Sequence, residues 1–232
     1  MNEKIRYVFR IIATLFLVIG FIGFLTGPIT AGFGFRFRNL DSFELPLGDL
    51  RGIAVDSQGN IYCGLQFYSR IQVYNAEGKF LYGKFINSAG GTFRIRINEK
   101  DQLEVATARN DKLYIFAKDG TLVRELSDVG HYFHNFGKTG ETRFHDKRQN
   151  VSYFKKASLL GPNIATKDSS GEKKVIIKTP FHKWLFKGPL PAWLFIASGG
   201  VISILFVSKD PLKHIPGGYL LRRKQEKKNN QI

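Results

Sequence analysis

The sequence predicts an all-β, propeller-like domain of antiparallel four-stranded repeats, plus two transmembrane α-helices. The first observation is an internal repeat: residues 55–84 align with residues 97–126 without a gap at an offset of 42, so that Val55 falls on Ile97. A period of this size, with several short strands per unit, is typical of propeller blades. The second observation is a pair of uncharged segments flanking the repeats, each of about the length that a membrane span requires.

The first uncharged segment begins close to the N-terminus. Residues 1–10 are expected to be a cytoplasmic N-terminus and residues 11–31 the first transmembrane helix. The positive-inside rule favours this orientation, because three basic residues precede the span: Lys4, Arg6 and Arg10. A cleaved signal peptide is the alternative, with small residues near position 31 as its cleavage site, and the sequence leaves both open.

The segment 32–50 has two interpretations. Phe33, Phe35 and Phe37 alternate with glycine and arginine, which suits the aromatic and basic belt at the end of a membrane helix. The same alternation suits a first strand. Pro46, Gly48 and neighbouring carboxylates then indicate a linker into the β domain, which is expected over residues 51–183.

Within the two clear repeats, about 51–87 and 91–127, strand signals alternate with turn signals. Phe93, Ile95 and Ile97 alternate with two arginines, which gives one apolar and one basic face. Short connections rich in Gly, Asp and Asn separate the strands and suit tight turns. Each repeat therefore reads as a meander of four antiparallel strands.

These residues resemble the NHL family of β-propeller repeats. The first copy carries Asp56-x-x-Gly59-Asn60-Ile61-Tyr62, then Arg70-Ile71-Gln72-Val73-Tyr74, then Glu77-Gly78-Lys79-Phe80. The second copy departs from the pattern, because Asn98, Asp101 and Gln102 replace Asp, Gly and Asn. The resemblance implies one four-stranded blade per repeat and a role as a binding platform. A third, eroded copy is predicted over 142–180, after an insertion within residues 130–145.

The second uncharged segment, 188–208, is predicted to be a second transmembrane helix. It is followed by a basic cytoplasmic tail, 209–232, whose expected lipid-contacting residues are Arg222, Arg223, Lys224, Lys227 and Lys228. Small residues at helical spacing predict helix-packing faces on both spans. They are Gly20, Gly23 and Gly27 on the first helix, and Gly199 and Ser203 on the second.

The formal charge of +16 does not indicate nucleic-acid binding, because basic residues are densest beside the two apolar segments. In that position they serve membrane topology and anionic lipids. The single cysteine, Cys63, can form no internal disulfide, and its place on an apolar strand face predicts a small buried hydrophobe.

Candidate sites for chemistry are few. His131, His134 and His145 lie around the insertion and are weak candidates for metal ligands, because their spacing matches no standard site. No Ser-His-Asp arrangement, carboxylate pair or phosphate-binding glycine loop occurs with the required spacing. We therefore expect no catalytic residue, no cofactor and no enzymatic activity.

The number of repeats poses a problem of closure. About 157 residues lie between the spans, which allows three blades and a remainder, whereas propellers close with about four to eight. Either residues 33–47 contribute to a fourth blade, or the domain stays open and its uncovered surface is covered by a partner, such as a second copy that completes a six-bladed ring.

The expected function is that of a membrane-anchored binding or scaffold protein of the cell envelope. It would be an accessory or assembly subunit of a membrane complex, with both termini cytoplasmic, two spans in the cytoplasmic membrane and an extracytoplasmic β domain. Its partners would be membrane lipids and other membrane subunits or a second copy. The alternative is a receptor or sensor for an anionic envelope polymer or small ligand, bound by Arg94, Arg96 and Lys112.

Overall fold

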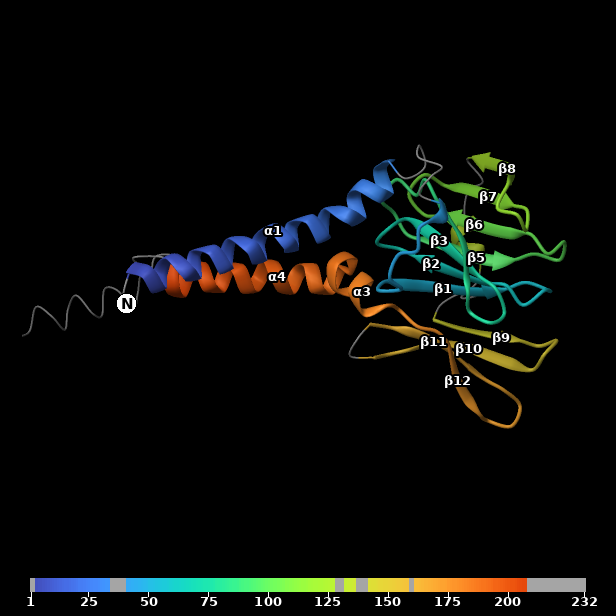
Figure 1. Cartoon of the computed structure of the whole chain (residues 1–232). Helices are drawn as coiled ribbons and strands as arrows, with labels where there is room; N and C mark the ends of the chain where they lie inside the picture. The colour runs from blue at the N-terminus through green and yellow to red at the C-terminus, as the bar shows by residue number, and fades with distance from the viewer. Residues whose placement is uncertain (1–2, 34–40, 128–131, 137–141, 159–160, 208–232) are drawn as a thin grey trace, which may run out of the picture. The chain divides into compact units, whose positions relative to one another are not determined.

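The computed structural model describes residues 3–33, 41–127, 132–136, 142–158 and 161–207 (Figure 1). The chain forms two compact units, one of residues 1–22 and 192–232 and the other of residues 23–191. Helix α1 (Glu3–Phe33) begins in the first unit, and helix α4 (Pro189–Ile202) continues there into a short π-helical segment, η3 (Ser203–Val207). Two shorter helices, α2 (Tyr132–Asn135) and α3 (Phe181–Lys187), belong to the second unit.

The second unit contains three antiparallel sheets of four strands, as a propeller-like domain requires. Each sheet is a meander in chain order. The first consists of β1 (Leu50–Val55), β2 (Ile61–Leu65), β3 (Arg70–Tyr74) and β4 (Phe80–Phe85). The second consists of β5 (Phe93–Ile97), β6 (Leu103–Thr107), β7 (Lys112–Phe116) and β8 (Leu122–Ser127). The third consists of β9 (Arg143–Asp146), β10 (Val151–Lys156), β11 (Asn163–Lys167) and β12 (Lys173–Ile177).

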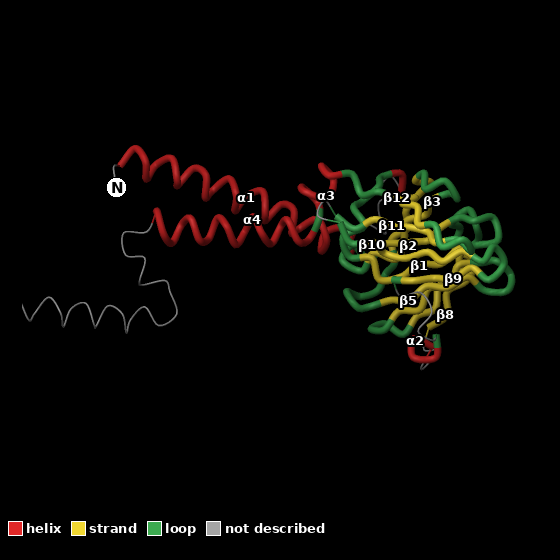
Figure 2. The backbone as a smooth tube through the Cα atoms, turned by 90° about the horizontal axis from the view of Figure 1, so that it is seen from below, coloured by secondary structure: helices red, strands yellow, loops and turns green. Residues whose placement is uncertain are grey.

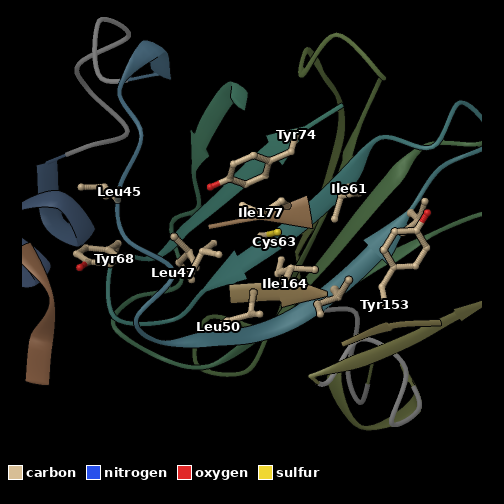
Figure 3. Packing of buried hydrophobic residues seen from close by; sticks show 13 residues of the cluster. Leu45, Leu47, Leu50, Ile61, Cys63, Tyr68, Tyr74, Tyr153, Ile164 and Ile177 are labelled. Atoms are coloured by element: carbon tan, nitrogen blue, oxygen red, sulfur yellow. The ribbon is translucent and has the colours of Figure 1, made fainter. Parts of the chain in front are cut away.

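The three sheets pack face to face, with the first sheet in the middle. One apolar cluster fills the space between the first and second sheets and includes Ile71, Val73, Phe93 and Val105. The other lies between the first and third sheets and includes Cys63 and Ile164 (Figure 3). Strand β1 contacts both β5 and β9, so the first strands of all three sheets lie together (Figure 2). The order of packing is therefore third, first, second, which leaves one outer face at each end.

Two glycines show how closely neighbouring sheets approach. Gly78 has a φ of +81° and Gly120 a φ of +79°, a region that glycine enters without steric cost. A Cβ at Gly78 would collide with the carbonyl of Ile176 in the third sheet, and one at Gly120 would lie 2.8 Å from the ring of Tyr82 in the first. The turns of one sheet therefore press against the next.

The linker before β1 is not a strand in its described part, residues 41–49. The alternating residues 34–38, which suggested a first strand, lie outside the described residues, so that interpretation stays a prediction. Leu45 and Leu47 enter the cluster between the first and third sheets, where both are almost fully buried (Figure 3). Burial of these two side chains holds the segment against the sheets, because their apolar surface leaves water there.

Among the described residues, one helix is long and apolar enough to cross a membrane, Glu3–Leu25, and not the two that the sequence predicts. The second predicted span contains a shorter apolar helix, Leu190–Phe206, of 17 residues. At 1.5 Å per residue this helix measures about 25 Å, somewhat less than the roughly 30 Å hydrocarbon core of a bilayer.

Candidate functional site

The outer face of the second sheet is covered by the chain's own insertion. Phe136, which follows α2, packs with Ala106 and Leu113 of this face and is only 2% exposed. The guanidinium of Arg96 lies 4.2 Å from the centre of the Phe136 ring, and that of Arg94 lies 4.5 Å from the Phe133 ring. Such cation–π contacts add to the apolar burial, so this end of the stack has an intramolecular cover.

The three basic residues expected to bind an anionic ligand contact side chains or carbonyls of the second sheet and α2. Arg94 also donates a hydrogen bond of 2.9 Å to the carbonyl of Phe133. Arg96 forms an ion pair of 2.7 Å with Glu104, and Lys112 forms one with Glu125. Each of these side chains therefore has an internal partner, and binding of an anion by the three residues stays a prediction.

The outer face of the third sheet has a different composition. Tyr153 and Ile164 point toward the first sheet, where they join the buried cluster. Because successive side chains of a strand point to opposite faces, their neighbours Ser152, Phe154 and Ala165 belong to the outer face. The pairing of strands then places His145, Ser152, Lys167 and Lys173 side by side in one row across all four strands.

This face carries a shallow groove of about 510 Å³. Its lining includes six residues whose side chains belong to the outer face: Arg143, His145, Ser152, Phe154, Lys167 and Lys173. Phe144 and Tyr153, whose side chains pack toward the first sheet, complete it. We call these residues the third-sheet groove. In the described part of the chain, no ion pair involves Arg143, Lys167 or Lys173, in contrast to the arginines of the second sheet.

Positive charge is concentrated in the third sheet. Residues 142–178 contain nine Lys and Arg against three Asp and Glu. Residues 50–85 contain four against two, and residues 93–127 contain seven against six. The net charges are thus +6, +2 and +1, so the basic character of the β domain comes mainly from one sheet.

The candidate metal ligands do not form a metal site among the described residues. His131 lies outside them. His134 is exposed on α2, with its ring edge-on to Phe133, while Nδ1 of His145 lies 3.0 Å from Oγ of Ser152. No group of three His, Cys, Asp or Glu side chains that could hold a metal occurs in the described part of the chain.

The His145–Ser152 pair also does not complete a nucleophilic triad. In a Ser-His-Asp triad a carboxylate orients the imidazole through its second nitrogen. Within the described residues, no carboxylate is hydrogen-bonded to His145. The pair therefore supplies polar donors to the third-sheet groove, and we assign no reaction to it.

The glycines predicted to pack helices lie at a close contact between α1 and α4. A Cβ at Gly20 would lie 2.8 Å from both the carbonyl oxygen of Ala192 and the backbone nitrogen of Ile196. One at Gly199 would lie 2.9 Å from the carbonyl oxygen of Ala13. Gly23 is buried and Ser203 lies in η3; Gly27 lies in α1, in the part whose side chains are not described. The predicted lipid-contacting residues all lie outside the described residues: Arg222, Arg223, Lys224, Lys227 and Lys228.

Cys63 is fully buried in β2, within the cluster between the first and third sheets (Figure 3). Burial in this apolar environment raises the pKa of its thiol, so the reactive thiolate is suppressed. Asp56, in the turn between β1 and β2, caps that turn. Its carboxylate accepts hydrogen bonds from the backbone nitrogens of Gln58 and Asn60. Neither residue forms part of a reactive site.

A network of polar contacts that the sequence did not suggest attaches the linker to the first sheet. Gln72 donates a hydrogen bond to the carbonyl of Leu45 and accepts one from its backbone nitrogen. Glu44 accepts a hydrogen bond of 3.1 Å from the Tyr74 hydroxyl and one of 2.8 Å from Lys183 in α3. The two segments that enter and leave the sheets are thereby joined to each other.

No protein-family model matches the chain, and no curated protein matches it. Weak structural similarities exist, all with low TM-scores. Virginiamycin B lyase from Staphylococcus aureus, solved with quinupristin, is 16% identical over 59% of this chain and 44% of that chain, with a TM-score of 0.32. A protein of unknown function from Bacteroides caccae is 14% identical over 60% and 52%, with a TM-score of 0.31. A putative gluconolactonase is 10% identical over 60% of this chain and 54% of that chain, with a TM-score of 0.27.

The chain thus spans about half the length of these solved structures. At such TM-scores the similarities carry no argument about activity or ligand. The description of the β domain rests on its own three sheets, and the functional argument rests on its own surfaces.

Proposed function

We propose that this chain is a membrane-anchored binding protein that displays the three-sheet domain outside the cytoplasmic membrane and serves as an accessory or assembly subunit of a membrane complex. The observation that carries the proposal is the character of the first unit. A helix that is apolar around its whole circumference is typical of a buried core or a membrane span, and here the apolar side chains are exposed.

The exposed apolar residues occur on both helices. On α1 they include Ile11, Leu15, Val18, Phe21 and Ile22, between 45% and 63% exposed. On α4 and η3 they are Leu190, Trp193, Leu194, Val201, Leu205 and Phe206. Water would disfavour this surface at about 25 cal/mol per Å², whereas lipid tails accommodate it.

We further propose that α4 with η3 is a second span, although it is short. Its apolar stretch Leu190–Phe206, of 17 residues, lies at the lower end of the range that membrane helices use. Support comes from its packing against α1, since small residues permit close backbone approach between membrane helices. The rings of Phe9 and Phe206 stack at 4.4 Å, and those of Phe16 and Phe195 meet edge-on at 5.5 Å.

The sidedness can be tested with single cysteines, because the native Cys63 is fully buried. Two variants of the full chain are needed: Ser170→Cys, in the exposed turn between β11 and β12, and Asn229→Cys, in the basic tail. A membrane-impermeant maleimide should label the first in intact cells and the second only after permeabilisation. The wild-type chain is the control and should stay unlabelled.

The opposite labelling pattern would overturn the proposed orientation. Release of the chain from membranes by alkaline carbonate would contradict membrane anchoring itself. The role as a subunit requires a further result, namely a partner that remains bound at fixed stoichiometry during purification in mild detergent. A chain that purifies alone and binds an anionic polymer would instead favour the receptor or sensor.

A further inference from the structure

The outer face of the third sheet contains an unusual pairing of like charges. Lys167 on β11 and Lys173 on β12 lie directly opposite each other in the antiparallel register. Side chains at such positions have Cβ atoms about 5 Å apart, and like charges there are destabilising. If this face contacted only water, the repulsion between the two lysines would lower the stability of the sheet without a compensating contact.

The neighbouring carboxylates do not neutralise the positive charge of the lysine pair. Asp168 and Glu172 lie in the turn that joins the two strands, but the Asp168 carboxylate is occupied by hydrogen bonds from Ser170 Oγ at 2.6 Å and the Glu172 backbone at 3.0 Å. In the described part of the chain, neither acid forms an ion pair with Lys167 or Lys173. The two positive charges are therefore available to an external anion.

Other donors extend the pair into a row. Ser152 and His145 continue the row toward β9, and Arg143 lies on the same face one row further along the strands. Neighbouring strands are about 4.8 Å apart, so four strands span roughly 14 Å. Ammonium, guanidinium and hydroxyl groups are all donors to phosphate oxygens, and guanidinium can donate two hydrogen bonds at once.

We propose that the third-sheet groove binds a linear phosphate-bearing polymer, whose repeated anionic groups lie along the row from Lys173 to His145. The charge complementarity carries this assignment, together with the hollow shape of the site, since a chain enters a groove whereas a flat lipid surface meets protruding side chains. A second copy docked through the same face would place like charges against each other. The assignment rests on the proposed binding role and specifies its ligand.

The face is also unsuited to packing against a further blade. Faces that are buried between sheets here carry mainly Ile, Leu, Val and aromatic side chains, whereas this one carries Arg143, Lys167, Lys173 and Phe154. Burial of unpaired charges is strongly unfavourable in proteins. This argues against a ring completed by a second copy through this face.

The test uses the full chain in a nonionic detergent and dye-labelled inorganic polyphosphate, with binding followed by fluorescence anisotropy at several salt concentrations. The test variant is Lys167→Glu/Lys173→Glu. The matched control is Lys79→Glu/Lys100→Glu, which changes the net charge equally at exposed turns of the first and second sheets. The test variant should bind roughly tenfold more weakly or worse and show a smaller salt dependence, while the control should stay within about twofold of the wild type.

Circular dichroism and thermal unfolding of each variant must show an unchanged fold, and Lys167→Gln/Lys173→Gln provides a milder replacement. Equal losses in both double variants would overturn the proposal, because binding would then depend on total charge. Binding to phosphatidylglycerol vesicles or poly-L-glutamate without binding to polyphosphate would also overturn it. A third outcome is that the chain does not bind polyphosphate, although Ser170→Cys is labelled as expected and the chain stays in the membrane. This outcome would overturn the assignment of the ligand but not the proposal of a membrane-anchored domain.

Discussion

Asp101 illustrates how one residue connects two repeats. It occupies the position of Gly59 in the repeat pattern and keeps the left-handed backbone, with a φ of +60°. Its carboxylate accepts hydrogen bonds from the backbone nitrogen and hydroxyl of Ser57, in the first sheet, and pairs with Lys118. This difference between the two copies of the repeat therefore supplies a contact between sheets that glycine could not make.

The replacement Asp101→Asn should lower the free energy of unfolding by about 1 kcal/mol at neutral pH, because a charge-assisted contact between sheets is weakened. Burial raises the pKa of Asp101, but hydrogen bonds from Lys118 and Ser57 outweigh this effect and lower it overall. A carboxyl group whose folded pKa is depressed contributes stability above its unfolded pKa and loses it as pH falls through the folded value. The difference between variant and wild type should therefore begin to shrink below about pH 4, near the unfolded pKa of Asp, and disappear below the lowered folded pKa.

The control is Asp111→Asn, at another left-handed position, with a φ of +44°. Among the described residues Asp111 has no hydrogen bond to another sheet. Urea unfolding of both variants across a pH series measures the difference. Equal effects of the two replacements, or an effect of Asp101→Asn that persists in acid, would show that the contact with Ser57 does not contribute.

At the scale of elements, the contact between α1 and α4 depends on residues without a side chain. A methyl group at Gly20 would lie 2.8 Å from backbone atoms of Ala192 and Ile196, which cannot rotate away. Gly200, one residue after Gly199, has nothing within 4 Å of the same methyl position. The two glycines thus offer a matched pair for measuring helix packing.

We expect Gly20→Ala to lower the thermal stability of the full chain in detergent, because the helices must separate by several tenths of an ångström and lose dispersion contacts. Gly200→Ala should leave stability unchanged or raise it slightly, since alanine favours the helix by up to about 1 kcal/mol in water. The two variants are compared by heating each one and measuring the fraction that remains unaggregated by size-exclusion chromatography. A destabilised Gly200→Ala together with a normal Gly20→Ala would contradict this helix contact.

The cover on the second sheet is the other element whose role can be measured. Phe136 buries its ring against Ala106 and Leu113 and beneath Arg96. Phe136→Ala should cost about 3 kcal/mol, a typical value for removal of a buried aromatic ring. Phe133→Ala, at a half-buried position, should cost clearly less. Chemical denaturation of the β domain measures both, and equal small losses would show that the insertion does not cover this face.

At the scale of the whole molecule, the β domain is a stack with two unlike ends. One end is covered by α2 and Phe136, and the other presents the third-sheet groove. An open stack usually exposes surfaces prone to association, but here one end is covered and the other is charged. This arrangement permits an open three-sheet domain without requiring a second copy for closure.

The like charges of the groove should leave a measurable trace in stability. Lys173→Glu would place a carboxylate opposite Lys167 and should raise the free energy of unfolding by about 0.2–1 kcal/mol. Added salt should shrink this gain, because screening already weakens the repulsion in the wild type. Lys79→Glu, on the first sheet, is the control and should show no such gain in urea unfolding.

Loss of stability in Lys173→Glu would mean that the lysine pair is not under repulsion. Taken with the polyphosphate measurement, the gain would show that the native pair lowers stability while it supports binding. Residues kept for function commonly have this property.

Several features could be predicted because they depend on local sequence. The period of 42 residues, the alternation within strands and the turn residues were enough for the first two four-stranded antiparallel sheets, and an eroded third copy indicated the third. The apolar run of α1 was enough for one helix of spanning length. The burial of Cys63 followed from its alignment with Val105 in the second copy of the repeat.

The order in which the sheets pack and the partners of the charges were decided only by the tertiary structure. Arg94, Arg96 and Lys112 look like an available basic face in the sequence, but the side chains that engage Arg94 and Arg96 include Phe133 and Phe136, which are about 40 residues away. The row from Lys173 to His145 depends on the pairing of four strands in a repeat whose pattern is eroded. Periodicity fixes which way a side chain points within its own strand, whereas contacts between strands and sheets depend on distances that the linear sequence does not contain.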